Sequence, residues 1–404
     1  MPQDSAPEAI ARSLTVRTVS LTTSVQTLTS FAVVVFSVLA PVAARDFDVP
    51  AASPGALISV VFFSATFSGL ASGAFTARFG PVGTLRGSVA LVCLAFLLGA
   101  GGTLGLAIVF SAIAGFAHGT VNPASSMVLA KAVPAHQRSL MFSIKQTGVP
   151  MGIAIAGVVL PAMVQVMSWR QALLLLSVVA LLFIPMLTPF SRIFDAERRR
   201  DHPIAFAGVG DSFRLIFANA RLRQLAIAST VFAFVQLVVN TFLVTYLHLE
   251  LEFSLATSGM VLSVTSLASV FARIFWGWVA DRTGRPRHVL ATLGVLMGLG
   301  CIGGGLFSQA WPIGAVLAIG VLWGISAIAW NGVLLAEVAH LSPEGRIASV
   351  TSGIQAVLFL GSIFGPLIFG AFAHAVGGFG LGFLLVAPFP IICGIWMIFS
   401  RPRV

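Results

Sequence analysis

The sequence predicts an all-α membrane protein with twelve transmembrane helices in two pseudo-symmetric six-helix bundles. Three observations predict it. Hydrophobic residues make up 57% of the chain and charged residues only 9%, which excludes an ordinary soluble globule. Apolar stretches of about 20 residues, each enough to cross a ~30 Å hydrocarbon core, recur from end to end. A loop motif also occurs twice, about half a chain length apart, as in proteins built from two similar halves.

Twelve apolar segments provide the predicted helices. They are residues 18–42, 55–77, 86–101, 105–130, 140–166, 171–190, 224–248, 255–280, 288–308, 312–338, 347–374 and 378–400. The polar, basic stretch between the sixth and seventh segments predicts a cytoplasmic linker over 191–223, with a short amphipathic stretch near 211–219. We therefore expect an N-terminal bundle over 1–190 and a C-terminal bundle over 224–404.

The placement of basic residues predicts the orientation. With the N-terminus in the cytoplasm, Arg45 and Arg170 are the only Lys or Arg that fall in outer loops. This asymmetry follows the positive-inside rule and places both termini in the cytoplasm. The formal charge of +10 thus reflects topology, and no nucleic-acid partner is expected. Residues 1–16 lack an apolar core, so the first helix acts as its own insertion signal.

The sequence gives little support for a disulfide framework, a metal site or a catalytic site. The three cysteines, Cys93, Cys301 and Cys393, lie in apolar segments and predict neither a disulfide framework nor a metal site. No nucleophile–base pair or metal cluster fits the topology, so we expect neither an enzyme nor a cofactor. The abundance of Ala, Gly and Arg indicates a bacterial chain, which would be a multi-pass protein of the cell (inner) membrane.

The repeated loop motif carries a family resemblance. Gly277-Trp-Val-Ala-Asp281-Arg282-Thr-Gly284-Arg285 resembles the cytoplasmic loop motif of the major facilitator superfamily, and the resemblance spans the whole chain. It implies a transporter in which these motif residues serve gating. The implied gating residues are Gly277, Asp281, Arg282, Gly284 and Arg285 in the second copy and Gly73, Arg78 and Gly80 in the first. Ala77 stands where the family has Asp, which predicts a weakened latch in the N-terminal half. A tight turn with positive-inside arginines is the structural alternative.

Arg273 is a cation inside an apolar segment without an acidic residue inside any segment to pair with it. A charge at the centre of a membrane helix costs about 2.5–3.5 kcal/mol on insertion scales, so such a residue usually faces a polar cavity. Ser263, Ser266 and Ser269 share its helix face and predict a wet cavity. A guanidinium binds carboxylates in a bidentate fork. An Arg four residues before the motif glycine also resembles monocarboxylate and oxalate carriers of the superfamily, although packing or gating is an alternative role.

Lys145 is the second cation inside a segment. Gly148, Gly152 and Ala156 share its face, which lets a helix or a substrate come close. The stretch Ser143-Ile-Lys-Gln-Thr-Gly-Val-Pro150 resembles cyanate-permease-like members of the superfamily. Two interpretations stay open: Lys145 provides a second charge for substrate or gate, or its stem snorkels to the cytoplasmic interface.

Polar residues occur in the segments that, by the family resemblance, would line a central cavity. The candidates to contact substrate beside Arg273 and Lys145 are Gln26, His118, Asn122, Gln236, Asn240, Asn331 and Gln355. Hydrogen bonding between helices is the alternative role for each of them. Of the seven histidines only His118 is mid-membrane, and its ordinary pKa near neutrality makes it a candidate proton carrier.

We therefore expect a secondary transporter that moves a small organic anion by alternating access. The family resemblance also implies a transporter. The two unpaired cations favour a carboxylate substrate. The absence of a nucleotide-binding motif implies a gradient-driven symport, with protons as the expected coupling ion, and a monomer is expected. The alternative is an efflux carrier for hydrophobic neutral or anionic drugs, which the many Phe and Trp residues leave open.

Overall fold

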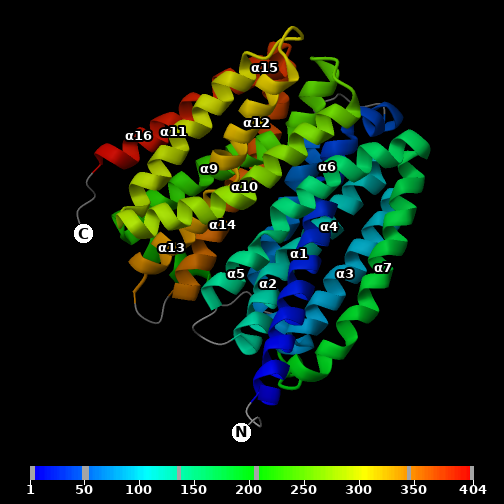
Figure 1. Cartoon of the computed structure of the whole chain (residues 1–404), viewed down its shortest axis with the longest axis vertical. Coiled ribbons are helices and arrows are strands. Elements are labelled where there is room, and N and C mark those ends of the chain that lie inside the picture. Colours follow the sequence, from blue (N-terminus) through cyan, green and yellow to red (C-terminus); the bar gives the residue numbers. More distant parts are fainter. Residues whose placement is uncertain (1–4, 48–53, 134–137, 204–208, 344–346, 401–404) are drawn as a thin grey trace.

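A computed structural model describes residues 5–47, 54–133, 138–203, 209–343 and 347–400 of the chain. This part is helical and contains twelve helices long and apolar enough to cross a membrane, as the sequence predicts. Figure 1 shows the first six of these spans on one side of the molecule and the last six on the other. We call these the N-half and the C-half.

The N-half contains seven helices, because its fifth span is broken into two. They are α1 (Ser5–Phe47), α2 (Pro54–Phe79), α3 (Pro81–Gly99), α4 (Leu104–Ala132), α5 (Arg138–Gln146), α6 (Gly148–Val166) and α7 (Trp169–Phe194). Local sequence sets several of these boundaries. Gly80 turns the chain between α2 and α3 with a φ of 82°, which favours glycine, and Pro81 begins α3. Ser168 and Gln171 form a capping box at the start of α7.

A short helix, α8 (Val209–Ala218), precedes the C-half and overlaps the stretch near 211–219 that the sequence predicts to be amphipathic. The helices of the C-half are α9 (Ala220–Leu249), α10 (Leu255–Thr283), α11 (Pro286–Gly305), α12 (Ile313–Ala327), α13 (Asn331–Leu341), α14 (Ile347–Val376), α15 (Phe379–Val386) and α16 (Pro388–Phe399). Asn219 caps α9 through its side chain, and Gly284 ends α10 in the left-handed conformation with a φ of 62°.

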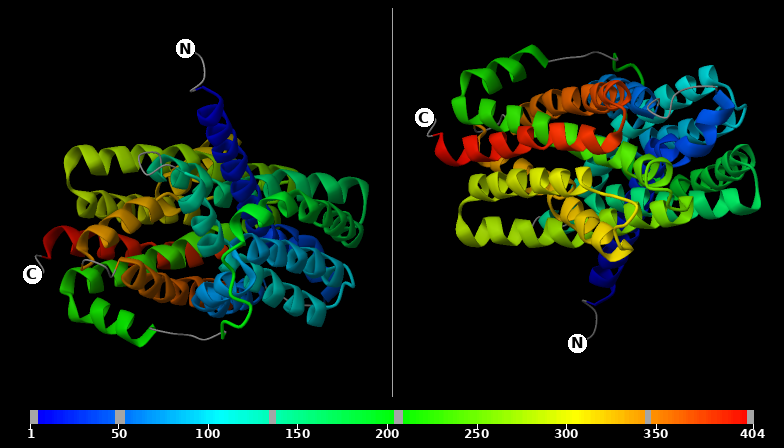
Figure 2. Two further views of the ribbon diagram at one scale, coloured as in Figure 1. Left: turned by 90° about the horizontal axis from the view of Figure 1, so that it is seen from below. Right: turned by 90° about the horizontal axis from the view of Figure 1, so that it is seen from above.

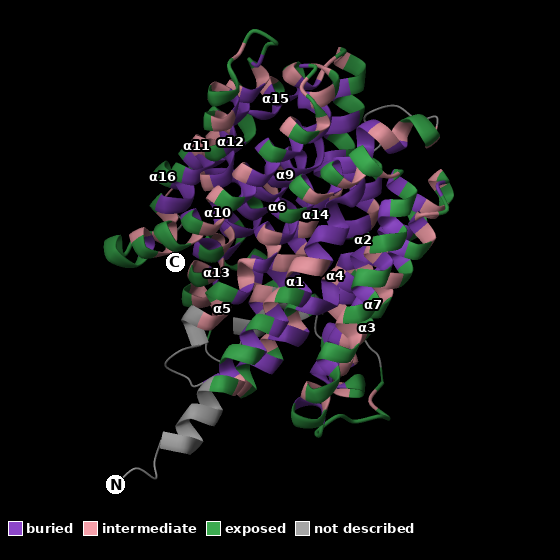
Figure 3. Ribbon diagram, turned by 45° about the vertical axis from the view of Figure 1, so that its right-hand side comes forward, coloured by how far each residue is buried: buried purple, intermediate pink, exposed green. Residues whose placement is uncertain are grey.

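Large apolar side chains cover the outside of the bundle, where a bilayer would contact it. Phe271 is 74% and Phe399 78% exposed, and α7 is the least buried of the twelve spans. Buried residues concentrate where the helices face one another (Figure 3). This distribution is that of a protein whose solvent is lipid rather than water.

Two of the broken spans meet near the centre of the molecule. The fifth span is interrupted at Thr147, between α5 and α6, and the tenth at Ile328–Trp330, between α12 and α13. Pro150 explains the first break: it has no N–H to donate to the carbonyl oxygen of Gln146 four residues earlier. A break inside a membrane is tolerated only where protein or a polar cavity satisfies the freed backbone groups.

The two halves touch at the end of the bundle where α2 and α10 begin, which we call the upper end. There α6 and α10 approach so closely that a Cβ on Gly157 would lie 2.6 Å from the carbonyl oxygen of Gly259. The Ser263 hydroxyl donates to the carbonyl oxygen of Ala154 at 2.7 Å across the same contact. On the other side of the molecule the Ser59 hydroxyl of α2 donates to the carbonyl oxygen of Ile363 of α14.

This packing corrects one expectation. Ser263, Ser266 and Ser269 do not line a wet cavity; all three are buried, and Ser263 bonds to α6. Their small side chains allow two helices to approach, which is the usual role of small residues at helix contacts in membranes. A row of serines beside an arginine fits close helix packing as well as a wet surface, so the row alone was a poor predictor of the cavity.

Candidate functional site

A cavity of about 510 Å³ lies between the two halves. It extends from the middle of the bundle toward the lower end, where α2, α4 and α10 end, because its lining includes Leu70, Ser126, Leu335 and Thr351. The upper end is closed by the contacts between the halves. Figure 2 shows the bundle along its length, with helices of both halves surrounding the centre.

Seven of the nine predicted substrate-contact residues line this cavity. They are Gln26, His118, Asn122, Gln236, Arg273, Asn331 and Gln355. They come from six different spans, far apart in the sequence, and the fold brings them together. Lys145 and Asn240 are not part of the lining. Whether any of these residues contacts a substrate stays a prediction.

Arg273 reaches both helix breaks at once. Its Nη1 donates to the carbonyl oxygen of Gln146, and its Nη2 donates to that of Ile328, each at 3.1 Å. Pro150 leaves the first of these acceptors without its helical donor. The second belongs to the residue that caps the C-terminus of α12, where carbonyl oxygens lack intrahelical partners. Arg273 therefore links the C-half to the N-half through main-chain atoms.

Two tryptophans complete this arrangement around the end of α12. Trp276 donates through its ring N–H to the carbonyl oxygen of Ile325 at 2.7 Å, and Trp330 does so to that of Ala327 at 3.1 Å. Together with Arg273 they satisfy three carbonyl oxygens at the break. The interrupted span is thus supported by side chains on both sides of it.

The charge of Arg273 has no carboxylate partner in the described part of the chain. Its Nε is buried and has no hydrogen-bond partner there. Carbonyl oxygens carry only partial charge, so they solvate the guanidinium without neutralising it. The arrangement gives Arg273 a structural role in holding the helix breaks and leaves its positive charge at the cavity wall without a carboxylate partner among the described residues.

Lys145 is fully buried, so the interpretation that its side chain snorkels to the interface is wrong. Its ammonium donates to Oδ1 of Asn122 and, at 3.4 Å, to the carbonyl oxygen of the same residue. Asn122 lines the cavity and Lys145 lies behind it. The glycines of this face pack against α1, where a Cβ on Gly148 would lie 2.8 Å from the carbonyl oxygen of Thr23. Lys145 thus positions Asn122 and places a charge close behind the cavity wall.

The uncharged polar residues leave several groups available to a ligand. Asn331 donates to Gln236 at 3.3 Å. Oε1 of Gln26 and Nδ1 of His118 are buried without a partner in the described residues, and both side chains belong to residues of the cavity wall. Asn240 is buried away from the cavity, so the structure does not group it with the other candidates.

Sequence reasoning missed part of the wall. The polar residues it missed are Thr66, Ser126, Gln146 and Thr351, and the aromatic ones are Phe62 and Phe359. Gln146 had a readable signal, since it lies four residues before a proline within an apolar segment. Phe62 and Phe359, whose ring centroids are 5.8 Å apart, are two of 33 phenylalanines, and nothing in the sequence distinguishes them.

The predicted gating residues lie at the lower end. In the first loop Arg78 lies over the ring of Phe79, and Asp195 accepts hydrogen bonds from the backbone N–H groups of Val82 and Gly83 at 2.8 and 2.9 Å. Asp195 therefore caps α3 although the loop itself lacks an Asp at position 77. In the second loop Arg282 lies over the ring of Trp278. The gating role of both copies stays a prediction.

Comparisons with known proteins identify the class that this fold and cavity define. The profile described as the Major Facilitator Superfamily matches residues 22–340 and 225–404. Monocarboxylate transporter 11 of Homo sapiens is 26% identical over 346 residues, covering 82% of this chain and 70% of that protein. The uncharacterized transporter YybO of Bacillus subtilis is 26% identical over 404 residues, covering 93% and 91%. Probable anion transporter 5 of Arabidopsis thaliana is 24% identical over 352 residues, covering 79% and 78%.

A solved structure of the nucleoside transporter NupG matches the fold with a TM-score of 0.78 at 14% identity, covering 96% of this chain and 100% of that one. The protein is thus a multi-pass inner-membrane transporter and not an enzyme. The chain belongs to the major facilitator superfamily.

Proposed function

We propose that this transporter moves a small organic anion with a carboxylate group by alternating access, coupled to protons. The observation that carries the proposal is the charge balance of the cavity. Among the described residues of its wall, Arg273 is cationic and none is Asp or Glu. A cavity of this kind attracts an anion and offers a cationic substrate no counter-charge.

The chemistry of the wall favours a carboxylate among anions. Arg273 uses one N–H of each Nη for a carbonyl oxygen, which leaves a second N–H on each Nη for a bidentate fork. Gln26, Gln236 and Asn331 line the same cavity, and in this proposal their amides bind the rest of a small polar molecule. Lys145, which donates a hydrogen bond to Asn122, adds to the positive electrostatic potential of the cavity. The names of two relatives, a monocarboxylate transporter and a probable anion transporter, agree with this substrate class.

The conformation supports alternating access. The cavity extends to the lower end and the halves meet at the upper end, and the positive-inside rule places the lower end in the cytoplasm. The structure would then be inward-facing. Reversal requires the upper contacts at Gly157–Gly259 and Ser59–Ile363 to part, and the lower ends to close over the cavity.

Proton coupling has one candidate side chain in the described wall. His118 lines the cavity, and its Nδ1 has no partner in the described residues. A histidine can take up or release a proton near neutral pH. The carboxylate substrate can also carry the proton itself, in which case His118 is a hydrogen-bonding group only.

A thermal-shift screen tests the substrate class, because a ligand that binds only the folded state raises the melting temperature. We expect carboxylates to stabilise the purified protein, and sugars and cationic dyes to leave its melting temperature unchanged. Stabilisation by a cationic drug alone would contradict the proposal.

The aromatic part of the wall favours one second candidate. Phe62, Phe359 and Trp330 line the same cavity and could hold the ring of a hydrophobic neutral or anionic drug, as an efflux carrier requires. In the same screen, stabilisation by neutral aromatic drugs without any response to small carboxylates would favour efflux.

A further inference from the structure

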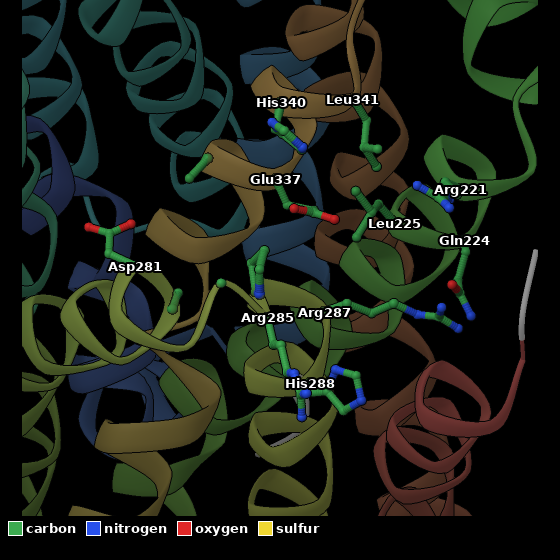
Figure 4. A pocket seen from close by; sticks show the side chains of 14 residues that line it. Arg221, Gln224, Leu225, Asp281, Arg285, Arg287, His288, Glu337, His340 and Leu341 are labelled. Carbon is green, nitrogen blue, oxygen red and sulfur yellow. The ribbon is translucent and has the colours of Figure 1, made fainter. Parts of the chain in front are cut away.

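A second cavity, of about 560 Å³, lies at the lower end of the C-half, apart from the central one. Figure 4 shows its charged side chains. Five basic residues line it: Arg221, Arg285, Arg287, His288 and His340. They come from the first or last turns of α9, α11 and α13 and from the loop that follows α10, so the pocket lies where membrane-length helices end.

The three arginines have no ion-pair partner among the described residues. The two acidic residues of the wall are Asp281 and Glu337, and neither brings an oxygen within 4.0 Å of an arginine nitrogen in this part of the chain. Asp281 lies apart from the other charged side chains, whereas Glu337 lies between Arg285 and Arg221 (Figure 4). Arg221 and Arg287 are close enough to repel each other, and Glu337 is close enough to attract both. The two guanidinium groups therefore lie near one carboxylate that forms an ion pair with neither of them.

Arg287 is held in place rather than free in solvent. Its Nη2 donates to the carbonyl oxygen of Ser400 and, at 2.9 Å, to the Ser400 hydroxyl, which also accepts a bond from the buried side chain of Gln224. The Nε of Arg287 is buried and has no partner among the described residues. Because Nε is buried, the donor group left for a ligand is Nη1, which bonds to none of the described residues. A guanidinium fixed in this way is preorganised for an oxyanion such as phosphate.

Apolar surface adjoins this charged pocket. Ser400 directly follows Phe399, which is 78% exposed, and Ile392 and Ile395 of the same helix are also exposed. A ligand with its phosphate on Arg287 could therefore lay acyl chains along α16. The cytoplasmic leaflet, where the positive-inside rule places this end, is the leaflet rich in anionic lipids.

We propose that this pocket binds the phosphate group of an anionic phospholipid, with Arg287 and Arg221 as its main contacts. The proposal is independent of the substrate of the central cavity. Delipidated protein in a neutral detergent, titrated with dihexanoyl phosphatidylglycerol, should show a saturable rise in melting temperature. Dihexanoyl phosphatidylcholine and inorganic phosphate should produce little or none.

Matched variants assign the effect to the pocket. Arg221→Gln and Arg287→Gln should each raise the half-saturating lipid concentration about tenfold, as expected for one lost charge-assisted contact. Glu337→Gln removes a repelling carboxylate and should lower that concentration several-fold. Arg214→Gln removes an exposed charge of α8 outside the pocket and should change it less than about twofold.

Two outcomes would overturn the proposal. If inorganic phosphate alone reproduces the full shift, the site binds soluble phosphate and the lipid assignment is wrong. If Arg221→Gln and Glu337→Gln both respond like the wild type, the lipid binds elsewhere. Arg221 is exposed and its removal leaves the Ser400 contacts intact, so this variant remains informative even if Arg287→Gln fails to fold.

Discussion

Arg273 donates a hydrogen bond to the carbonyl oxygen that Pro150 leaves without a helical partner. The acceptor is the carbonyl oxygen of Gln146, which lies in the other half, 127 positions from Arg273 in the sequence. The hydrogen bond is 3.1 Å long. Proline here does more than interrupt a helix. It exposes an acceptor at the wall of the cavity, and the cation predicted to bind substrate occupies that acceptor.

Removal of the Arg273 guanidinium tests the proposed substrate contact. Arg273→Ala should abolish carboxylate uptake in proteoliposomes, and Arg273→Lys should be markedly impaired because an ammonium cannot form the fork. Loss of a charge-assisted contact of about 1.5–3 kcal/mol weakens binding by roughly ten- to more than a hundredfold. A folded Ala variant that melts earlier but keeps its carboxylate affinity would show that Arg273 only supports the helix breaks.

Pro150→Ala tests the origin of the acceptor. The new N–H can bond to the Gln146 carbonyl oxygen, so α5 and α6 should become continuous and amide exchange near position 150 should slow. The helical preference of Ala over Pro, about 3 kcal/mol, is opposed by the loss of the Arg273 bond, about 1.5–3 kcal/mol, so net stability should change little. Pro189→Ala in α7, away from the cavity, is the control and should leave exchange near Thr147 unchanged. Unaltered exchange in the Pro150 variant would contradict the explanation of the break.

Lys145 and Asn122 should act as one unit. Lys145→Met removes the ammonium behind Asn122, and Asn122→Ala removes the side chain that it holds. Both should weaken carboxylate binding, and the double variant should be less impaired than the sum of the two, because contacting residues couple by about 0.5–3 kcal/mol. Lys145→Gln retains a donor for Asn122 and isolates the contribution of the charge. Strictly additive losses in the thermal-shift titration would mean that Lys145 acts independently of Asn122.

Ala77→Asp tests the first loop. If the missing Asp weakens the latch, its return should favour outward-facing states. Spin labels at Met127 and Ala336, exposed positions toward the lower ends of α4 and α13, should then show a larger share of short distances. Asp195 already caps α3 in this structure, so Asp195→Asn provides a comparison that perturbs the same loop without adding a charge. An unchanged distance distribution for Ala77→Asp would count against a latch at this position.

Much of the fold could be predicted because the bilayer imposes a length on every span. Each apolar run of about 20 residues becomes a helix, since no other open structure satisfies its backbone in lipid. The grouping of Gln26, His118, Asn122, Gln236, Arg273, Asn331 and Gln355 around one cavity also followed from polarity within such runs. Polar residues are costly there and gather where they avoid lipid.

The sequence pattern could not predict the environment of a residue whose type is common both at close helix contacts and at cavity walls. Ser263 looked like a cavity residue but packs against α6, because small residues serve close helix contact as well as hydration. Asn240 shares its helix with Gln236 but lies off the cavity. The partners of Arg273 are main-chain oxygens, and side-chain identity alone does not show which carbonyl groups a fold leaves unpaired.

The glycine contacts at the upper end have a consequence for the speed of the transport cycle. Where Gly157 meets Gly259 the backbones of the two halves touch, and the side chains beside this contact, those of Ser263 and Pro161, are small. Parting the halves there breaks the hydrogen bond from Ser263 to Ala154 but exposes little apolar area. The barrier to parting at this contact should therefore be low. A single methyl group at either glycine would keep the halves apart at this contact and favour the conformation that is open at the upper end.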